Sequence, residues 1–230
     1  MKLVWLGHGS WRIEIAQAVL LIDPWLAGNP SFPDDRRAEA IAGATHILLT
    51  HGHGDHASEI VELAGELSVP VIGIYDLMSF WEDRHGITVT GMNKGGTVEL
   101  GGAKVTMVNA CHSSSFAGSE GPIYAGAEAG FMIAGEGRVI YFSGDTDIMA
   151  DMGWMGQYHK PDIGILSCGG HFTMDMDRAA FAAEKFFDFK VVLPSHYKTF
   201  PLLAQDAAPL ARALPGICVI APEVLEEVTP

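Results

Sequence analysis

Hydrophobic residues along this chain occur mainly in short runs separated by glycine, proline or polar residues. Residues 11–15 alternate between apolar and polar side chains, which is the pattern of a strand with one buried face. Residues 163–166 are continuously apolar apart from one glycine, which indicates a strand buried on both faces. The same criteria predict further strands at 2–6, 18–22, 45–50, 69–74, 97–100, 104–109, 130–134, 138–142, 191–193 and 217–220.

Helices are predicted between several of these strands. Residues 57–66, 76–84, 177–187 and 206–214 have helical patterns, with one further helical turn around 35–41. Gly86 ends the second of these helices, and Asp175 or Asp177 marks the start of the third. The dipeptide Gly101-Gly102 predicts a hairpin turn. Residues 113–130 are rich in small residues and show no pattern, so we expect a long loop that is functional or mobile.

Composition narrows the class of protein. The 230 residues fit one domain, 1–230, since no Pro-, Gly- or Ser-rich linker divides them. Fourteen Lys and Arg against 28 Asp and Glu give a net charge of −14, which disfavours nucleic-acid partners. The sequence shows no signal peptide and no run long enough to span a bilayer, so we expect no membrane partner. Three widely spaced cysteines predict buried thiols without disulfides, and a cytoplasmic location.

A cluster of metal-ligand side chains follows the apolar run 47–49. His51, His53, Asp55 and His56 lie within six residues. Side chains two apart in an extended segment point the same way, so His51 and His53 can bind one ion together. We expect Gly52 and Gly54 to allow a sharp turn that brings Asp55 and His56 to a neighbouring site. A histidine-rich surface turn that binds nothing is the alternative, but the position at a strand end favours a metal site.

Three more candidate ligands also come after apolar strands: His112, Asp145 and His196. In layered α/β proteins, sites gather where loops converge at strand ends. The alternatives are a core histidine at 112 and an ordinary Asx turn at Asp145, within Gly-Asp-Thr. Spacing alone does not show that these distant segments meet.

The motif His-x-His-x-Asp-His at 51–56 is the signature of the metallo-β-lactamase superfamily, and the chain resembles that superfamily from Trp5 to Tyr197. Further matching segments are Trp5-Leu-Gly-His-Gly-Ser10, Leu21-Ile-Asp-Pro24, Ser143-Gly-Asp-Thr146 and Pro194-Ser-His-Tyr197. Within it, the chain is most similar to small prokaryotic metal-dependent hydrolases related to ascorbate-6-phosphate lactonases. The resemblance implies a four-layer αββα sandwich of two mixed sheets with helices outside.

The resemblance also implies a dinuclear metal centre. His51, His53 and His112 would hold one divalent ion, and Asp55, His56 and His196 the other, with Asp145 between them. Zinc is the first choice, with manganese or iron as alternatives. A hydroxide bridging the two ions would be the nucleophile, and Asp55 would help to orient it.

Three further residues are candidates for supporting roles. Asp23 ends the strand at 18–22, where its carboxylate can accept the free N–H of a ligating histidine; a surface turn before Pro24 is the alternative. His8 and His171 are candidates for substrate binding or for proton donation to the leaving group, and a structural role is equally open for both. His46, His85 and His159 fall outside the pattern. The methionines at 149–176 are read as packing rather than as a pliable pocket.

The leading functional hypothesis is a metal-dependent hydrolase of a small ester, lactone or phosphoester. The negative charge of the protein favours an uncharged ester or lactone as substrate. The resemblance to lactonases of phosphorylated substrates instead favours a substrate that carries phosphate. The alternatives are a phosphodiesterase or nuclease of the same superfamily, which would need a basic groove, and a non-catalytic metal-binding protein. A β-lactamase is disfavoured by the missing secretion signal, and a flavodiiron-type oxidoreductase by the missing flavin domain. Self-association into a homo-oligomer is compatible with the apolar content.

Overall fold

Two seven-stranded sheets form the centre of the protein, and the computed structural model describes all residues, 1–230. The first sheet has the order β16-β1-β2-β3-β4-β5-β6, and the second β15-β14-β13-β12-β11-β8-β7. The first sheet comprises β1 (Lys2–Trp5), β2 (Trp11–Ile15), β3 (Ala18–Ile22), β4 (His46–Leu48), β5 (Val71–Ile74), β6 (Val89–Met92) and β16 (Glu227–Val228). The second sheet comprises β7 (Thr97–Leu100), β8 (Ala103–Asn109), β11 (Ala129–Gly135), β12 (Arg138–Phe142), β13 (Ile163–Ser167), β14 (Val191–Ser195) and β15 (Cys218–Val219).

Both sheets are mixed in the same way. In the first, β16, β1, β2 and β3 pair antiparallel, and β3 through β6 pair parallel. In the second, β7, β8, β11 and β12 are antiparallel, and β12 through β15 are parallel. In each parallel half, helices connect the strands, as parallel pairing requires, and the inner strands are buried. The carboxyl ends of β4, β12 and β14 precede the predicted ligands at 51–56, Asp145 and His196.

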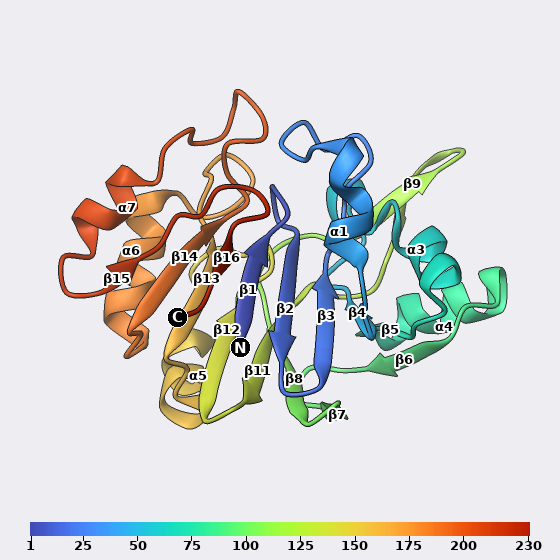
Figure 1. Cartoon of the computed structure of the whole chain (residues 1–230), viewed down its shortest axis with the longest axis horizontal. Coiled ribbons are helices and arrows are strands. Elements are labelled where there is room, and N and C mark those ends of the chain that lie inside the picture. The colour runs from blue at the N-terminus through green and yellow to red at the C-terminus, as the bar shows by residue number, and fades with distance from the viewer.

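Helices cover the outer faces of the two sheets (Figure 1). The first sheet carries η1 (Asp34–Arg36), α1 (Arg37–Ile41), α2 (Gly54–Ala57), α3 (Ile60–Leu67) and α4 (Tyr75–His85). The second carries α5 (Asp151–His159), α6 (Met176–Phe186) and α7 (Ala208–Ala213). A cluster of 65 buried hydrophobic residues runs through the molecule, with Trp5, Trp11 and Tyr141 among its largest members. This is the expected αββα sandwich. None of the helices is long and apolar enough to pass through a membrane.

Several local predictions are confirmed. β2 alternates buried and half-buried residues, as its sequence pattern indicates. α4 ends at Gly86, which takes the left-handed conformation with a φ of 68°. α6 begins after Asp175, whose carboxylate accepts a hydrogen bond of 2.8 Å from the Arg178 N–H. The methionines at 152, 155, 174 and 176 are buried in the core, which agrees with a packing role.

Other predictions are wrong. The helix expected at 57–66 is α3, which begins only at Ile60, and the preceding short helix α2 was not expected. The loop expected at 113–130 contains a hairpin of β9 (Ser115–Gly118) and β10 (Gly121–Tyr124), whose residues are mostly exposed and therefore leave no hydrophobic pattern. β6, β16 and α5 were not expected at all; α5 contains Gly153 and Gly156, which are poor helix formers. Cys111 and Cys218 are exposed, so only Cys168 is the expected buried thiol, and burial raises its pKa to about 12.

The two glycines of α5 provide a matched test of packing. A Cβ at position 156 would collide with the Phe186 carbonyl oxygen, whereas a Cβ at 153 would lie 3.7 Å from Phe186 Cδ1, an ordinary contact. We expect Gly156→Ala to lower the free energy of unfolding by about 1–3 kcal/mol, because α5 and α6 must separate. Gly153→Ala should be neutral or stabilise by up to about 1 kcal/mol. Urea unfolding of both variants checks this; equal effects would contradict the close approach.

Candidate metal centre

The predicted ligands converge on one site where the two sheets meet. The ligand atoms of His51, His53 and His112 form one group whose members lie within 4.8 Å of one another. A second group with the same spacing contains His8, Asp55, His56 and His196. The first set is the one expected for one ion. The second contains the three residues expected for the other ion, with His8 in addition.

Asp145 lies between the two groups. Its Oδ2 is 3.0 Å from His196 Nε2, 3.4 Å from His56 Nε2 and 3.7 Å from His112 Nε2. One carboxylate oxygen therefore faces histidines of both groups, which is the position predicted for a bridging ligand. Asp145 is 4% exposed, so this negative charge is nearly removed from water and requires a positive partner.

The ligand loop between β4 and α3 positions four of these side chains. β4 ends at Leu48, and His51 and His53 follow in an extended segment. Asp55 and His56 lie on α2, one short helical turn that begins after His53. The turn does not need left-handed glycines, because neither Gly52 nor Gly54 has a positive φ. Gly52 is required for space instead: a Cβ there would collide with Ala125.

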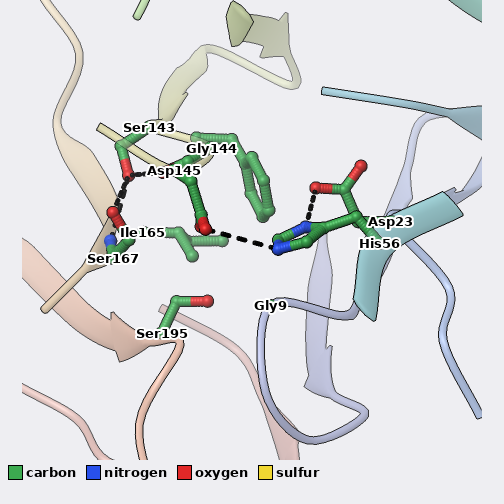
Figure 2. A pocket seen from close by; sticks show the side chains of 10 residues that line it. Gly9, Asp23, His56, Ser143, Gly144, Asp145, Ile165, Ser167 and Ser195 are labelled. Carbon is green, nitrogen blue, oxygen red and sulfur yellow. Dashed lines mark hydrogen bonds and ion pairs between the residues drawn. The ribbon is translucent and has the colours of Figure 1, made fainter. Parts of the chain in front are cut away.

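The histidine rings are oriented by partners behind them. His56 Nδ1 lies 2.8 Å from Asp23 Oδ2, so Nε2 points towards Asp145 (Figure 2). Asp23 also accepts hydrogen bonds from the N–H and the hydroxyl of Thr50, and His51 Nδ1 lies 2.9 Å from the same hydroxyl. Asp23 is thus the partner expected for a ligating histidine, and it is fully buried rather than in a surface turn. Thr50 was missed; its place directly before His51 was the available signal.

The geometry fits a bound metal ion better than a network of protons. His56 Nε2 and His196 Nε2 are buried, and their close contacts with Asp145 Oδ2 do not have the geometry of hydrogen bonds. His51 Nε2 and His53 Nδ1 lie 3.0 Å apart, with their rings at 82°. Two nitrogen ligands of tetrahedral zinc, each about 2.0–2.1 Å from the ion, are separated by roughly 3.3 Å. Imidazole and carboxylate donors are those that zinc, manganese and iron accept.

The charges of the cluster are strongly coupled in the metal-free chain. Burial lowers the pKa of His51 well below its ordinary value. Burial opposes protonation of His56 and His196 too, but the Asp145 carboxylate outweighs it, raising the pKa of His56 well above its usual range and that of His196 to about 9. The pKa of Asp145 is held well below its ordinary value, because His196 and His56 outweigh the effect of burial.

His8 lies behind Asp55 rather than on the solvent side. Its ring is fully buried, with Nε2 2.9 Å from Asp55 Oδ2 and Nδ1 2.9 Å from Thr199 Oγ1. Burial outweighs the hydrogen bond to Asp55 and lowers the pKa of His8 to about 4, so the ring is neutral at pH 7. Its Nε2–H then donates to Asp55, and Nδ1 faces the Thr199 hydroxyl, which is also 3.1 Å from the Tyr197 carbonyl oxygen. Both ring nitrogens are engaged, which leaves none for substrate; Thr199 was not predicted.

His171 is not brought to the cluster. Its side chain is exposed, its ring contacts Phe172, and no hydrogen bond or ion pair joins it to a predicted ligand. The structure therefore gives no support to the expected catalytic role of His171. His46, His85 and His159 also lie outside both groups, as expected.

Comparison with known proteins agrees with this geometry. Residues 19–197 match the model of the β-lactamase superfamily domain. The chain belongs to the metallo-β-lactamase superfamily. A UPF0173 metal-dependent hydrolase from Paracoccus denitrificans (strain Pd 1222) is 71% identical over 228 residues, covering 99% of both chains. Another, from Cereibacter sphaeroides (strain ATCC 17025 / ATH 2.4.3), is 66% identical over 229 residues, covering 100% of both chains.

A solved structure shares the whole fold. Igni18, a metallo hydrolase from the archaeon Ignicoccus hospitalis KIN4/I, superposes with a TM-score of 0.87 at 27% identity, over 99% of this chain and 97% of that one. Together with its relatives, this makes the protein a metal-dependent hydrolase of the superfamily. The family assignment and the two-sheet architecture predicted from the sequence are confirmed.

Metal binding by the histidine and aspartate cluster should raise the thermal stability of the protein. We expect zinc added to chelator-treated hydrolase, at a free concentration about 100-fold above its dissociation constant, to raise Tm by roughly 5–10 °C. The increment should grow between about pH 6 and pH 9. In the metal-free chain, protonated His56 and His196 contribute stability that is complete below pH 6.5 and lost through about pH 9. The bound ion instead requires neutral imidazoles. Thermal melts at several pH values check this; an increment that shrinks with pH would contradict metal binding by these rings.

Two substitutions at His8 distinguish the effect of losing its hydrogen bond to Asp55 from the effect of changing its backbone conformation. His8 has a φ of 53°, which asparagine tolerates well. Gln keeps a donor near the position of Nε2, whereas Asn is too short to reach Asp55. We expect His8→Asn to weaken binding of the ion held by Asp55 about 10–100-fold, and His8→Gln to restore most of it. Competition with a chromophoric chelator measures this. Complete loss of that ion in both variants would instead make His8 a direct ligand.

Proposed function

We propose that the protein hydrolyses a small carboxylic ester or lactone at a centre of two divalent cations, with zinc as the best-fitting metal. The observation that carries the proposal is the Asp145 carboxylate, which faces His112 on one side and His56 and His196 on the other. A bridging carboxylate between two sets of imidazoles supports two neighbouring ions rather than one.

In this proposal the residues divide into two holding sets. His51, His53 and His112 hold one cation, and His56, His196 and Asp55 hold the other, with Asp145 shared. When bound, the pair of cations would lower the pKa of a water from about 15.7 towards 7 and polarise the scissile carbonyl. Hydrolysis then adds one water across the acyl C–O bond and gives a carboxylic acid and an alcohol.

The exposure of the ligands supports one direction of substrate entry. His51, His56 and His196 are each 1% exposed and form the floor of the site. The side chains of Asp55 and His112 are 29% and 15% exposed, and His53 is half-buried. Substrate and water therefore approach over His53, Asp55 and His112, and Asp55 is placed to orient the incoming water. The substrate side of the centre also carries the exposed Ser113, whose Oγ is 3.3 Å from His53 Nε2.

Charge favours an ester or lactone over a phosphoester. No Lys or Arg side chain forms a hydrogen bond or an ion pair with a residue of the two ligand groups. Sites that bind phosphate usually provide bidentate arginine or a lysine. The net charge of −14 also repels anionic substrates and nucleic acids, so we propose a small uncharged molecule as the partner.

A screen with matched variants tests the proposal. The zinc- or manganese-loaded protein is assayed against carboxylic esters, lactones and phosphodiesters. We expect turnover of esters or lactones, and a loss of about a thousandfold or more in kcat/KM for His51→Ala and Asp145→Ala, together with loss of bound metal. His85→Ala, at an exposed position on α4, is the control. Full metal content in Asp145→Ala would contradict the bridge; turnover of phosphodiesters alone, or of nothing, would indicate a phosphodiesterase or a non-catalytic metal protein.

A further inference from the structure

An apolar pocket lies between α4 and the β9–β10 hairpin. It encloses about 260 Å³, and its lining includes Phe80, Phe116, Ile123, Tyr124 and Ala125. This volume is slightly below the range of about 300–1,000 Å³ for complete small-molecule sites, so it suits one part of a ligand. Asp76 is the only charged residue in the lining, and no basic side chain is present to attract an anion.

The pocket wall exposes large apolar side chains to solvent. Tyr124 is 73% exposed, Ile123 46% and Phe80 44%, and the Phe80 and Phe116 rings stack with centroids 5.6 Å apart. Phe80, Ile123 and Tyr124 lie outside the buried core, whereas Phe116 packs against it. The three exposed side chains therefore contribute little to the packing of the core. A concave wall of exposed aromatic residues is a feature of ligand sites.

The pocket adjoins the metal-ligand loop through Ala125, one of its lining residues. The Ser114 hydroxyl accepts a hydrogen bond of 3.2 Å from the Gly52 N–H, and Ala125 fills the space beside Gly52. β9 packs against α2, the helix that carries Asp55 and His56. Phe116 is four residues after His112, at most roughly 14 Å along an extended chain. In Figure 1 the hairpin with β9 projects from the upper right edge of the molecule, above α3.

We propose that this pocket binds the apolar arm of the substrate, an alkyl tail or an aromatic ring, while the ester or lactone group lies over His53, Asp55 and His112. This inference rests on the proposed function and narrows its substrate class. The hairpin that forms the wall starts at Ser115, directly after the serines that contact the ligand loop. An arm that follows this wall therefore leads away from the open side of the metal centre.

A second copy of the chain is a weaker occupant. Aromatic side chains bury about 150–250 Å² each when covered, so the exposed parts of Tyr75, Phe80, Ile123 and Tyr124 amount to roughly 400 Å². A stable interface buries about 800 Å² on each partner. The surface formed by these four side chains is too small for such an interface but large enough for the apolar arm of a small molecule.

The test compares two lactones that share a ring and differ in an alkyl tail, δ-valerolactone and δ-undecalactone. We expect the zinc-loaded wild type to have a higher kcat/KM for the tailed lactone. Tyr124→Ala and Phe80→Ala should each lower the ratio of kcat/KM values, tailed over untailed, by roughly tenfold or more. Tyr158→Ala, which removes another exposed aromatic ring on α5, should keep the wild-type ratio. Tyr124 is so exposed that its truncation removes little packing, and thermal melts verify folding.

Binding of octanoate, a tailed carboxylate that is not hydrolysed, distinguishes the two proposals. The wild type could hydrolyse neither lactone yet bind octanoate in calorimetry, with about tenfold weaker binding in Tyr124→Ala. That result would support the pocket proposal and contradict the proposed ester or lactone hydrolysis. If Tyr124→Ala and Phe80→Ala both keep the wild-type ratio of kcat/KM values and the wild-type affinity for octanoate, the pocket proposal is wrong. Conversion of a dimer to a monomer by Tyr124→Ala in light scattering, without a change in the ratio, also overturns it and makes the patch a subunit interface.

Discussion

The attraction between one buried carboxylate, Asp145, and the histidines around it is the interaction on which the site depends. Its oxygen faces His56, His112 and His196 within 3.7 Å, in a region closed to solvent. A negative charge in such a place is costly unless a positive charge lies beside it. Without metal, protons on the imidazoles supply that charge; a bound metal would supply it in their place. Metal binding, stability and the reaction are therefore different consequences of the same electrostatic requirement.

The backbone at this site is held in unusual conformations by contacts between the two sheets. His8, Asp23 and His196 have φ values of 53°, 47° and 57°, in the left-handed region that most side chains avoid. The carbonyl of His8, in the turn between β1 and β2, accepts hydrogen bonds from the His196 N–H at the end of β14 and from Trp5 Nε1. Trp11 Nε1 donates to Ser195 Oγ across the same junction. These bonds stabilise the strained turns and fix the sheets' relative position at the ligands.

The centre has a rigid floor and a more open rim. In the floor, Asp23 orients the His56 ring and Thr50 the His51 ring, and all three rings are buried, so the floor has little freedom to adapt. The rim is made of His53, Asp55, His112 and the serines that lead into the β9–β10 hairpin. The metal-binding side chains thus lie in the core, where packing enforces their geometry. In our proposal, substrate selection belongs to an exposed hairpin, where the sequence can change at low cost in stability.

The sequence by itself determined most strands, the ligand types and the strand ends at which they occur, because apolar periodicity and ligand spacing are local properties. Family resemblance supplied the pairing of distant ligands. Only the tertiary structure decided that His8 faces Asp55, that His171 lies away from the ligands, and that the expected loop at 113–130 contains a hairpin. The break between α2 and α3 and the pairing of β16 with β1 were likewise hidden. Each of these depends on contacts between segments far apart in the chain, or on exposed residues that leave no hydrophobic pattern.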